Sequence, residues 1–209
     1  MRFCSNCGAT ASGNFCIECG TSLRSSETDS RQSTDLINTI NYEDLLSIPN
    51  VRDLIAHHAT LSKQHMSSEE FLKLCDTAFV PFTGVPLASF GSIVGSMGQH
   101  LGVKTGKTRS ITFKKPSGKI LVALLCSLAR QGQKVHCVQQ ETDRCIVEAV
   151  IVSDLWTWGG SLIVSVQNIG DDTYVEAATI IKGQVYDWGK SNRCLEQLFS
   201  DLSMTPALM

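Results

Sequence analysis

The sequence predicts an α+β protein in which a small cysteine-rich unit precedes a larger domain built on an antiparallel sheet. The cysteine-rich unit covers residues 1–23, and the polar run at residues 24–35 predicts a flexible linker because it offers no apolar anchor. Further along, residues 104–209 contain segments in which apolar and polar side chains alternate, as they do in half-buried strands. Helical patterns lie before, within and after these segments.

The composition and net charge limit the kinds of protein that this chain could be. A chain of 209 residues with 43% hydrophobic and 18% charged residues can form one sizeable core and a small appendage. Its net charge of -2 argues against binding nucleic acid by bulk electrostatics alone. Nine cysteines are present, but the N-terminus has no apolar export segment. We therefore expect a cytoplasmic protein with four cysteines on a metal and five as small buried side chains.

The N-terminal cysteines form a repeat, with Phe-Cys-x-x-Cys-Gly at residues 3–8 and again at 15–20. Each C-x-x-C can fold into a knuckle, and two knuckles supply the four thiolates that zinc accepts in tetrahedral geometry. We expect one structural Zn²⁺ held by Cys4, Cys7, Cys16 and Cys19. A unit this small cannot bury enough apolar surface to fold alone, so the metal would stabilise it. A pair of redox or disulfide motifs and an iron site are the alternatives.

This double knuckle resembles the short N-terminal zinc ribbons of many otherwise unrelated prokaryotic proteins. The resemblance covers about residues 3–23, and all four cysteines match. Such ribbons contact proteins or nucleic acids, so the resemblance implies an adaptor role in a bacterial protein.

Residues 36–103 read as a helical region. One amphipathic helix is expected after Pro49, with an apolar stripe of Val51, Leu54, Ile55 and Leu61. Ser67 or Ser68 is a candidate cap for a second helix, whose stripe comprises Phe71, Leu72, Leu74 and Cys75. Residues 79–103 contain no Lys, Arg, Asp or Glu. Because Pro81 and Pro86 interrupt this segment, we expect a buried or self-associating helix from Leu87 to about Leu101 rather than a membrane span.

The order β-α-β-β-β-β-α is expected for residues 104–209. A first strand contains Ile111 and Phe113, and a helix with an apolar face of Leu121, Leu124, Leu125 and Leu128 ends at Gly132. Strands are expected at Lys134–Gln139, Arg144–Val152, Ser161–Gln167 and Thr173–Lys182. A last helix from about Trp188 to Leu202, capped by Asp187, has the stripe Leu195, Leu198, Phe199 and Leu202. This order is similar in topology to one repeat of the TATA-binding-protein-like fold over about residues 108–203.

The two faces of this sheet are expected to differ. Cys145, Val147, Ala149 and Ile151 should face the helices. The opposite face combines apolar and polar side chains, namely Ile146, Glu148, Val150, Val152, Ile163, Ser165, Gln167, Tyr174, Glu176 and Ile180. Because so mixed a face is often covered, we expect residues 79–103 or a second copy of the chain to lie on it.

Two further groups of residues are candidate binding sites. A basic band is formed by Lys104, Lys107, Arg109, Lys114, Lys115 and Lys119, which could contact phosphates or guard a sheet edge. Trp156, Trp158 and Trp188 could form an aromatic face for a ligand or partner, or pack at the corners of the fold.

Catalysis is not expected. Residues 102–108 resemble a P-loop but have the wrong glycine spacing and precede a strand. The five histidines are scattered, and Glu148 and Glu176, which could face each other across strands, have no evident pocket. The sequence therefore favours a non-catalytic adaptor or regulatory protein that binds a protein partner, with a possible homo-oligomer. The alternatives are a hydrophobic-ligand-binding domain and a nucleic-acid-binding protein that uses the ribbon and residues 104–119.

Overall fold

The computed structural model describes residues 2–3, 10–11, 39–62, 66–79, 107–151, 159–181 and 189–204. The chain divides into two compact units, Met1–Asp35 and Leu36–Met209. In the first unit, strand β1 (Arg2–Phe3) pairs antiparallel with β2 (Thr10–Ala11). The expected linker at residues 24–35 lies outside the described residues.

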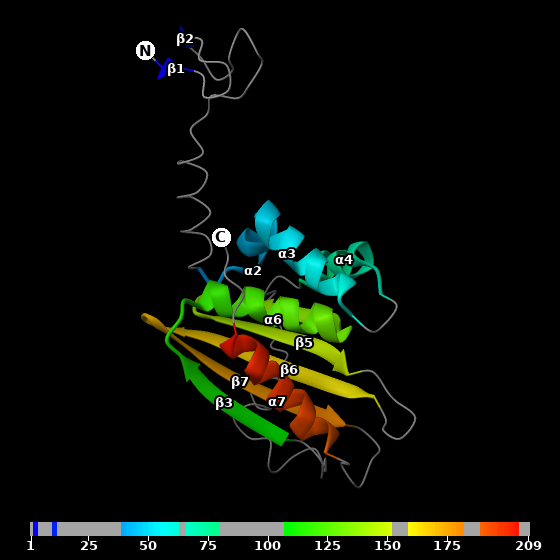
Figure 1. Ribbon diagram of the computed structural model, residues 1–209. Helices are drawn as coiled ribbons and strands as arrows, with labels where there is room; N and C mark the ends of the chain where they lie inside the picture. The colour runs from blue at the N-terminus through cyan, green and yellow to red at the C-terminus, as the bar shows by residue number, and fades with distance from the viewer. Residues whose placement is uncertain are drawn as a thin grey trace. The chain divides into compact units, whose positions relative to one another are not determined.

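The second unit is built on a five-stranded antiparallel sheet with strand order β3-β7-β6-β5-β4 (Figure 1). Its strands are β3 (Lys107–Phe113), β4 (Lys134–Gln140), β5 (Arg144–Ile151), β6 (Gly160–Ile169) and β7 (Asp172–Ile181). The predicted α+β class is confirmed. Strands β6 and β7 extend further than predicted, until Ile169 pairs with Asp172. Gly170 adopts a positive φ of 65° in the resulting tight turn, a conformation that glycine allows at little cost.

Helices α6 (Ser117–Gln131) and α7 (Lys190–Ser203) lie over the same face of the sheet (Figure 1). Helix α6 ends where predicted, at Gly132, whose left-handed φ of 66° closes the last turn. The start of α7 corrects the prediction. The helix begins at Lys190, not Trp188, because Gly189 has a φ of 78° and cannot belong to a right-handed helix. The predicted cap Asp187 lies outside the described residues.

Three shorter helices precede the sheet in the chain: α2 (Tyr42–Ser47), α3 (Pro49–Thr60) and α4 (Ser68–Ala78). Helices α2 and α3 pack on α6, whereas α4 packs on α3 and on the edge strand β4. The Ser67 side chain caps α4 by accepting a hydrogen bond from the Glu70 amide, as predicted. Leu61, however, is 54% exposed, because α3 ends at Thr60 and its stripe is completed by Ala59. These helices share one hydrophobic core with α6 and the sheet.

The burial of α6 follows from this layering. Its residues Ile120–Ala129 are all buried, on every side of the helix, because the sheet covers one side and α3 the other. The predicted face of Leu121, Leu124, Leu125 and Leu128 is confirmed but is only part of the buried surface.

Within the described part of the chain, no helix is long and apolar enough to cross a membrane. Of the uncharged segment at residues 79–103, only Phe79 is described, and it forms an isolated parallel bridge to Val138 of β4. The helix expected from Leu87 to about Leu101 lies outside the described residues.

Candidate functional site

The predicted zinc ligands Cys4, Cys7, Cys16 and Cys19 lie outside the described residues. The backbone next to them is described in part. Phe3 pairs with Thr10 across β1 and β2, so residues 4–9, which contain the first C-x-x-C, connect two paired strands. Among the described residues, no group of three or more His, Cys, Asp or Glu side chains could hold a metal ion.

The remaining five cysteines, all in the second unit, are free thiols. Burial raises the pKa of the Cys75, Cys126 and Cys145 thiols to about 12. Burial also raises the pKa of the Cys137 and Cys194 thiols. All five therefore stay protonated at neutral pH and lack the thiolate that a nucleophile or metal ligand needs. Four of them are buried and Cys137 is half-buried, which agrees with the predicted role as small buried side chains.

The predicted basic band runs along the edge strand β3 and into α6. Its members differ in their surroundings. The Arg109 guanidinium lies over the Phe199 ring of α7, 5.3 Å from the ring centroid, and Lys115 Nζ donates to the Ser203 carbonyl at 2.8 Å. Lys107 and Lys114 are exposed, Lys119 is half-buried, and Lys104 lies outside the described residues. Two members thus bind α7 rather than forming one continuous free surface.

The aromatic candidates Trp156, Trp158 and Trp188 all lie outside the described residues. Glu148 and Glu176 do not face each other. They lie on β5 and β7, which are separated by β6, with Glu148 opposite Ile163 and Glu176 opposite Ser165. Sequence alternation placed both on one face correctly, but strand order could not be read from it.

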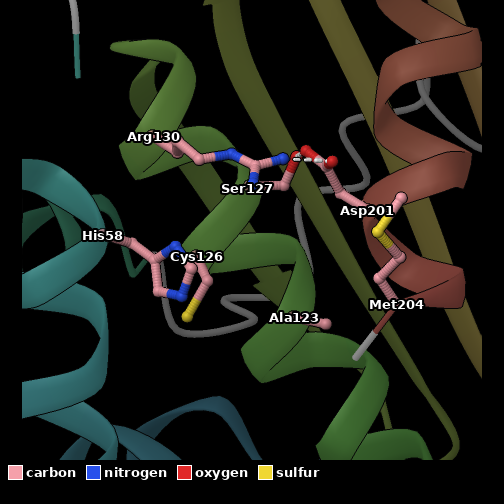
Figure 2. A pocket seen from close by; sticks show the side chains of 7 residues that line it. All are labelled: His58, Ala123, Cys126, Ser127, Arg130, Asp201 and Met204. Carbon is pink, nitrogen blue, oxygen red and sulfur yellow. Dashed lines mark hydrogen bonds and ion pairs between the residues drawn. The ribbon is translucent and has the colours of Figure 1, made fainter. Parts of the chain in front are cut away.

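A polar cluster that the sequence did not reveal lies where α6 meets α7, around the carboxylate of Asp201 (Figure 2). Ser127 Oγ donates to Asp201 Oδ2 at 2.7 Å, Gln197 Nε2 donates to Oδ1 at 2.8 Å, and Gln131 Nε2 approaches Oδ2 at 3.4 Å. The Arg130 guanidinium forms an ion pair with the same carboxylate. Because Asp201 is 9% exposed, this number of donors is what a buried charge needs.

Beside the cluster is a small cavity of about 110 Å³, and His58 reaches into it from α3 (Figure 2). Its Nδ1 atom is buried and has no hydrogen-bond partner among the described residues. Burial, together with the nearby Arg130 charge, lowers the pKa of His58, so the neutral imidazole is favoured. Cys126 and Ala123 complete the apolar side of this cavity.

This arrangement favours a structural role over catalysis. The Ser127 hydroxyl donates a hydrogen bond to Asp201, and the same carboxylate also accepts hydrogen bonds from Arg130 and Gln197. A general base with so many donors is poorly placed to take a further proton. The cluster instead joins α6 to α7. Its only sequence signal was an acidic residue, Asp201, between the stripe residues Leu198 and Leu202.

A second hollow, of about 260 Å³, lies against α2 and α4 and is lined by Tyr42, Arg52, Cys75, Asp76 and Phe79, among others. Arg52 and Asp76 form a two-pronged ion pair across it, with N–O distances of 2.8 and 3.0 Å. The buried Tyr42 hydroxyl donates to the Cys75 carbonyl at 3.0 Å. The Arg52 and Asp76 side chains thus bind each other, and the Tyr42 hydroxyl binds the backbone of Cys75.

Comparison of the chain with protein-family models, with curated proteins and with solved structures found no match.

Proposed function

We propose that this chain is a non-catalytic adaptor whose N-terminal zinc ribbon binds a protein partner. In this proposal Cys4, Cys7, Cys16 and Cys19 hold one structural Zn²⁺, and Leu36–Met209 is the folded body that carries the ribbon. The observation that carries the proposal is the repeated Phe-Cys-x-x-Cys-Gly unit. The β1–β2 pairing on either side of the first C-x-x-C supports it.

The chemistry of the larger unit also supports this proposal. Its thiols have a raised pKa and are buried or half-buried. Asp201, the most buried carboxylate in the part of the unit that the structure describes, is bound by side chains of α6 and α7. Polar groups in this unit join helices to one another. A partner-binding role for the ribbon needs nothing more from the body than a stable fold.

Metal content is the first test. Purified full-length protein should contain one zinc per chain by elemental mass spectrometry, and the double variant Cys4→Ser/Cys16→Ser should contain none. The matched control is Cys137→Ser, which removes a thiol from the sheet unit and should leave the zinc content unchanged. Zinc-free wild-type protein would contradict the proposal.

Partner binding is the second test. The full chain and the Cys4→Ser/Cys16→Ser variant should be compared as baits, with circular dichroism confirming that the α+β body stays folded in both. A protein captured by the wild type and lost from the variant would support the ribbon as the contact. Equal capture by both baits would show that another surface binds the partner.

Nucleic-acid binding is the less favoured function, because Arg109 and Lys115 are engaged with α7. A salt titration of binding to single- and double-stranded oligonucleotides separates the two functions. Binding through the basic band would fall steeply with salt, and Lys107→Glu/Lys114→Glu would weaken it. The adaptor proposal expects no such steep dependence.

A further inference from the structure

The two edge strands of the sheet, β3 and β4, differ in what lies beside them. Strand β4 is flanked by other parts of the chain, because Phe79 forms a parallel bridge to Val138 and helix α4 packs on the strand. The ladder between β4 and β5 also shifts its register between Val135 and Cys137. A neighbouring element and an irregular ladder both protect a sheet edge from pairing with other chains.

Among the described residues, strand β3 at the opposite edge has neither protection (Figure 1). It pairs with β7 through seven consecutive residue pairs without a shift of register. The side chains of residues 107–110 and of Thr112 are exposed. In an antiparallel pair, alternate residues turn both the backbone N–H and the C=O away from the partner strand. Strand β3 therefore presents a regular row of backbone donors and acceptors along its outer edge.

The side chains of β3 form two sets, because successive residues point to opposite faces of the sheet. The set on the helix side consists of two cations followed by two apolar residues: Lys107, Arg109, Ile111 and Phe113. The set on the other side consists of short hydroxyl side chains: Thr108, Ser110 and Thr112. The strand contains no acidic residue. A segment lying beside β3 would thus meet positive charge at one end and apolar side chains at the other.

Arg109 is held in position although it is exposed. Its guanidinium lies 5.3 Å from the centroid of the Phe199 ring, and Phe113 stacks on the same ring with the centroids 6.4 Å apart. A guanidinium that lies over a ring keeps the N–H groups at its rim for a carboxylate. Because the contact already restricts the side chain, binding a carboxylate would cost less conformational entropy.

The charge on this edge limits what can bind there. Antiparallel pairing of two β3 strands over their full length would bring Lys107 of each copy next to Lys114 of the other, which disfavours a second copy. Nucleic-acid binding depends on neutralising many phosphates, and the few cations of one strand supply little of that. An extended acidic segment of a protein suits both the cations and the open backbone.

We propose that the outer edge of β3 binds an extended acidic segment of a partner protein as an additional antiparallel strand. Carboxylates of that segment lie opposite Lys107 and Arg109, and its apolar side chains lie opposite Ile111 and Phe113. Main-chain hydrogen bonds supply the affinity, and the two cations supply the preference for acidic sequences. This surface goes beyond the proposed function of the zinc ribbon, and either one can fail without the other.

A designed peptide tests the proposal on the full chain. The probe is acetyl-Val-Thr-Val-Thr-Glu-Thr-Glu-amide, whose two glutamates lie opposite Arg109 and Lys107 when it pairs antiparallel along β3. In an NMR titration of the isotope-labelled chain, the amides of β3 and β7 should shift and saturate. A control peptide with proline at its third and fourth positions should bind at least about ten-fold more weakly, because proline lacks the backbone donor that a ladder needs.

Charge variants at the two edges provide the matched comparison. Lys107→Glu should weaken binding of the probe about ten-fold, because an opposite-charge pair across the strands becomes a like-charge pair. Lys134→Glu makes the same change at the first residue of β4 and should leave the affinity unchanged. A probe that ends in lysine instead of glutamate should bind the Lys107→Glu variant better than it binds wild type.

Three results would overturn the proposal. The first is the absence of saturable shifts in β3, or saturable shifts only in other elements. The second is an equal loss of affinity in Lys107→Glu and Lys134→Glu, which would mean that net charge alone attracts the peptide. The third is an oligonucleotide that shifts the β3 amides when the peptide does not, which would assign this edge to nucleic acid.

Discussion

The two faces of the sheet reach similar burial with different residues. Under α6 and α7 the strands present a mainly apolar surface, in which Val147, Leu162 and Val164 are at most 1% exposed. Thr173 and Thr179 of β7 lie on the same face and are fully buried. On the other face, isoleucines alternate with serine and glutamate. The polar side chains of the strands under the helices are thus small and fully buried, whereas the second face carries the carboxylates of Glu148 and Glu176 at half-buried positions. Two sheet faces can therefore be equally buried although they differ in residue composition.

The sequence of the central strands reflects this double burial. Strand β5 reads Arg-Cys-Ile-Val-Glu-Ala-Val-Ile, and its alternation is interrupted by apolar residues on both faces. Strands with one face in water alternate cleanly, whereas strands buried on both faces read as nearly continuous apolar runs. Strands β5 and β6 are intermediate between the two, which agrees with the burial of Ile146 and Ile163 on the face away from the helices.

The largest effect is expected on the helix side. Leu124→Ala in α6 removes a fully buried side chain between two layers, and we expect a loss of about 3–5 kcal/mol in the free energy of unfolding. Chemical denaturation measures it. Leu61→Ala, at an exposed position after α3, is the control and should change the free energy by less than about 0.5 kcal/mol. A small effect at Leu124 would mean that α6 is not enclosed on both sides.

Alanine substitutions at two neighbouring residues of β6 compare the burial of the two sheet faces most directly. Leu162 faces the helices and Ile163 the other side, and both are at most 2% exposed. We expect Leu162→Ala and Ile163→Ala each to lower the free energy of unfolding by about 2–4 kcal/mol. If the second face were uncovered, Ile163→Ala would cost only about 1 kcal/mol or less, because little apolar surface would be lost from the core.

A smaller effect, on the pH dependence of the free energy of unfolding, is expected from His58 on the helix side of the sheet. Because burial lowers the pKa of His58 in the folded chain, the unfolded state binds its proton more readily. The contribution to stability is therefore complete above the ordinary pKa of 6.5 and is lost as the pH falls through that value toward the folded pKa. His58→Gln should remove this dependence. Unfolding curves of both proteins between neutral and mildly acidic pH measure the difference.

The smallest effect is expected from Glu176 on the second face, where the pH dependence of stability has the opposite sign to that of His58. Its folded pKa is raised above the ordinary value of 4.5, so the folded state holds the proton more tightly. The stabilising contribution is complete below pH 4.5 and is lost as the pH rises through the folded pKa. Relative to wild type, Glu176→Gln should therefore gain stability as the pH rises through this window. A variant that tracks wild type at every pH would mean that water reaches the carboxylate.

Much of the fold could be predicted from local patterns, and the candidate sites only in part. The Ser67 cap, the glycine stop at Gly132 and the stripe of α7 each depend on residues within one or two turns, which sequence spacing shows directly. The Asp201 cluster could not be found this way, because Asp201 and its partners Ser127 and Arg130 lie far apart in the chain. The same holds for Arg109, whose position over Phe199 depends on how α7 packs beside β3.

The sequence by itself determined the α+β class, the order of strands and helices in residues 104–209, and the cysteine repeat that predicts a zinc site. Short-range preferences for helix, strand and turn suffice for these features. Only the tertiary structure decided that α3 encloses the far side of α6, that two basic residues serve α7, and that the second face is buried at its centre. Each of these depends on contacts between segments distant in the chain, where packing of the whole core outweighs local preference.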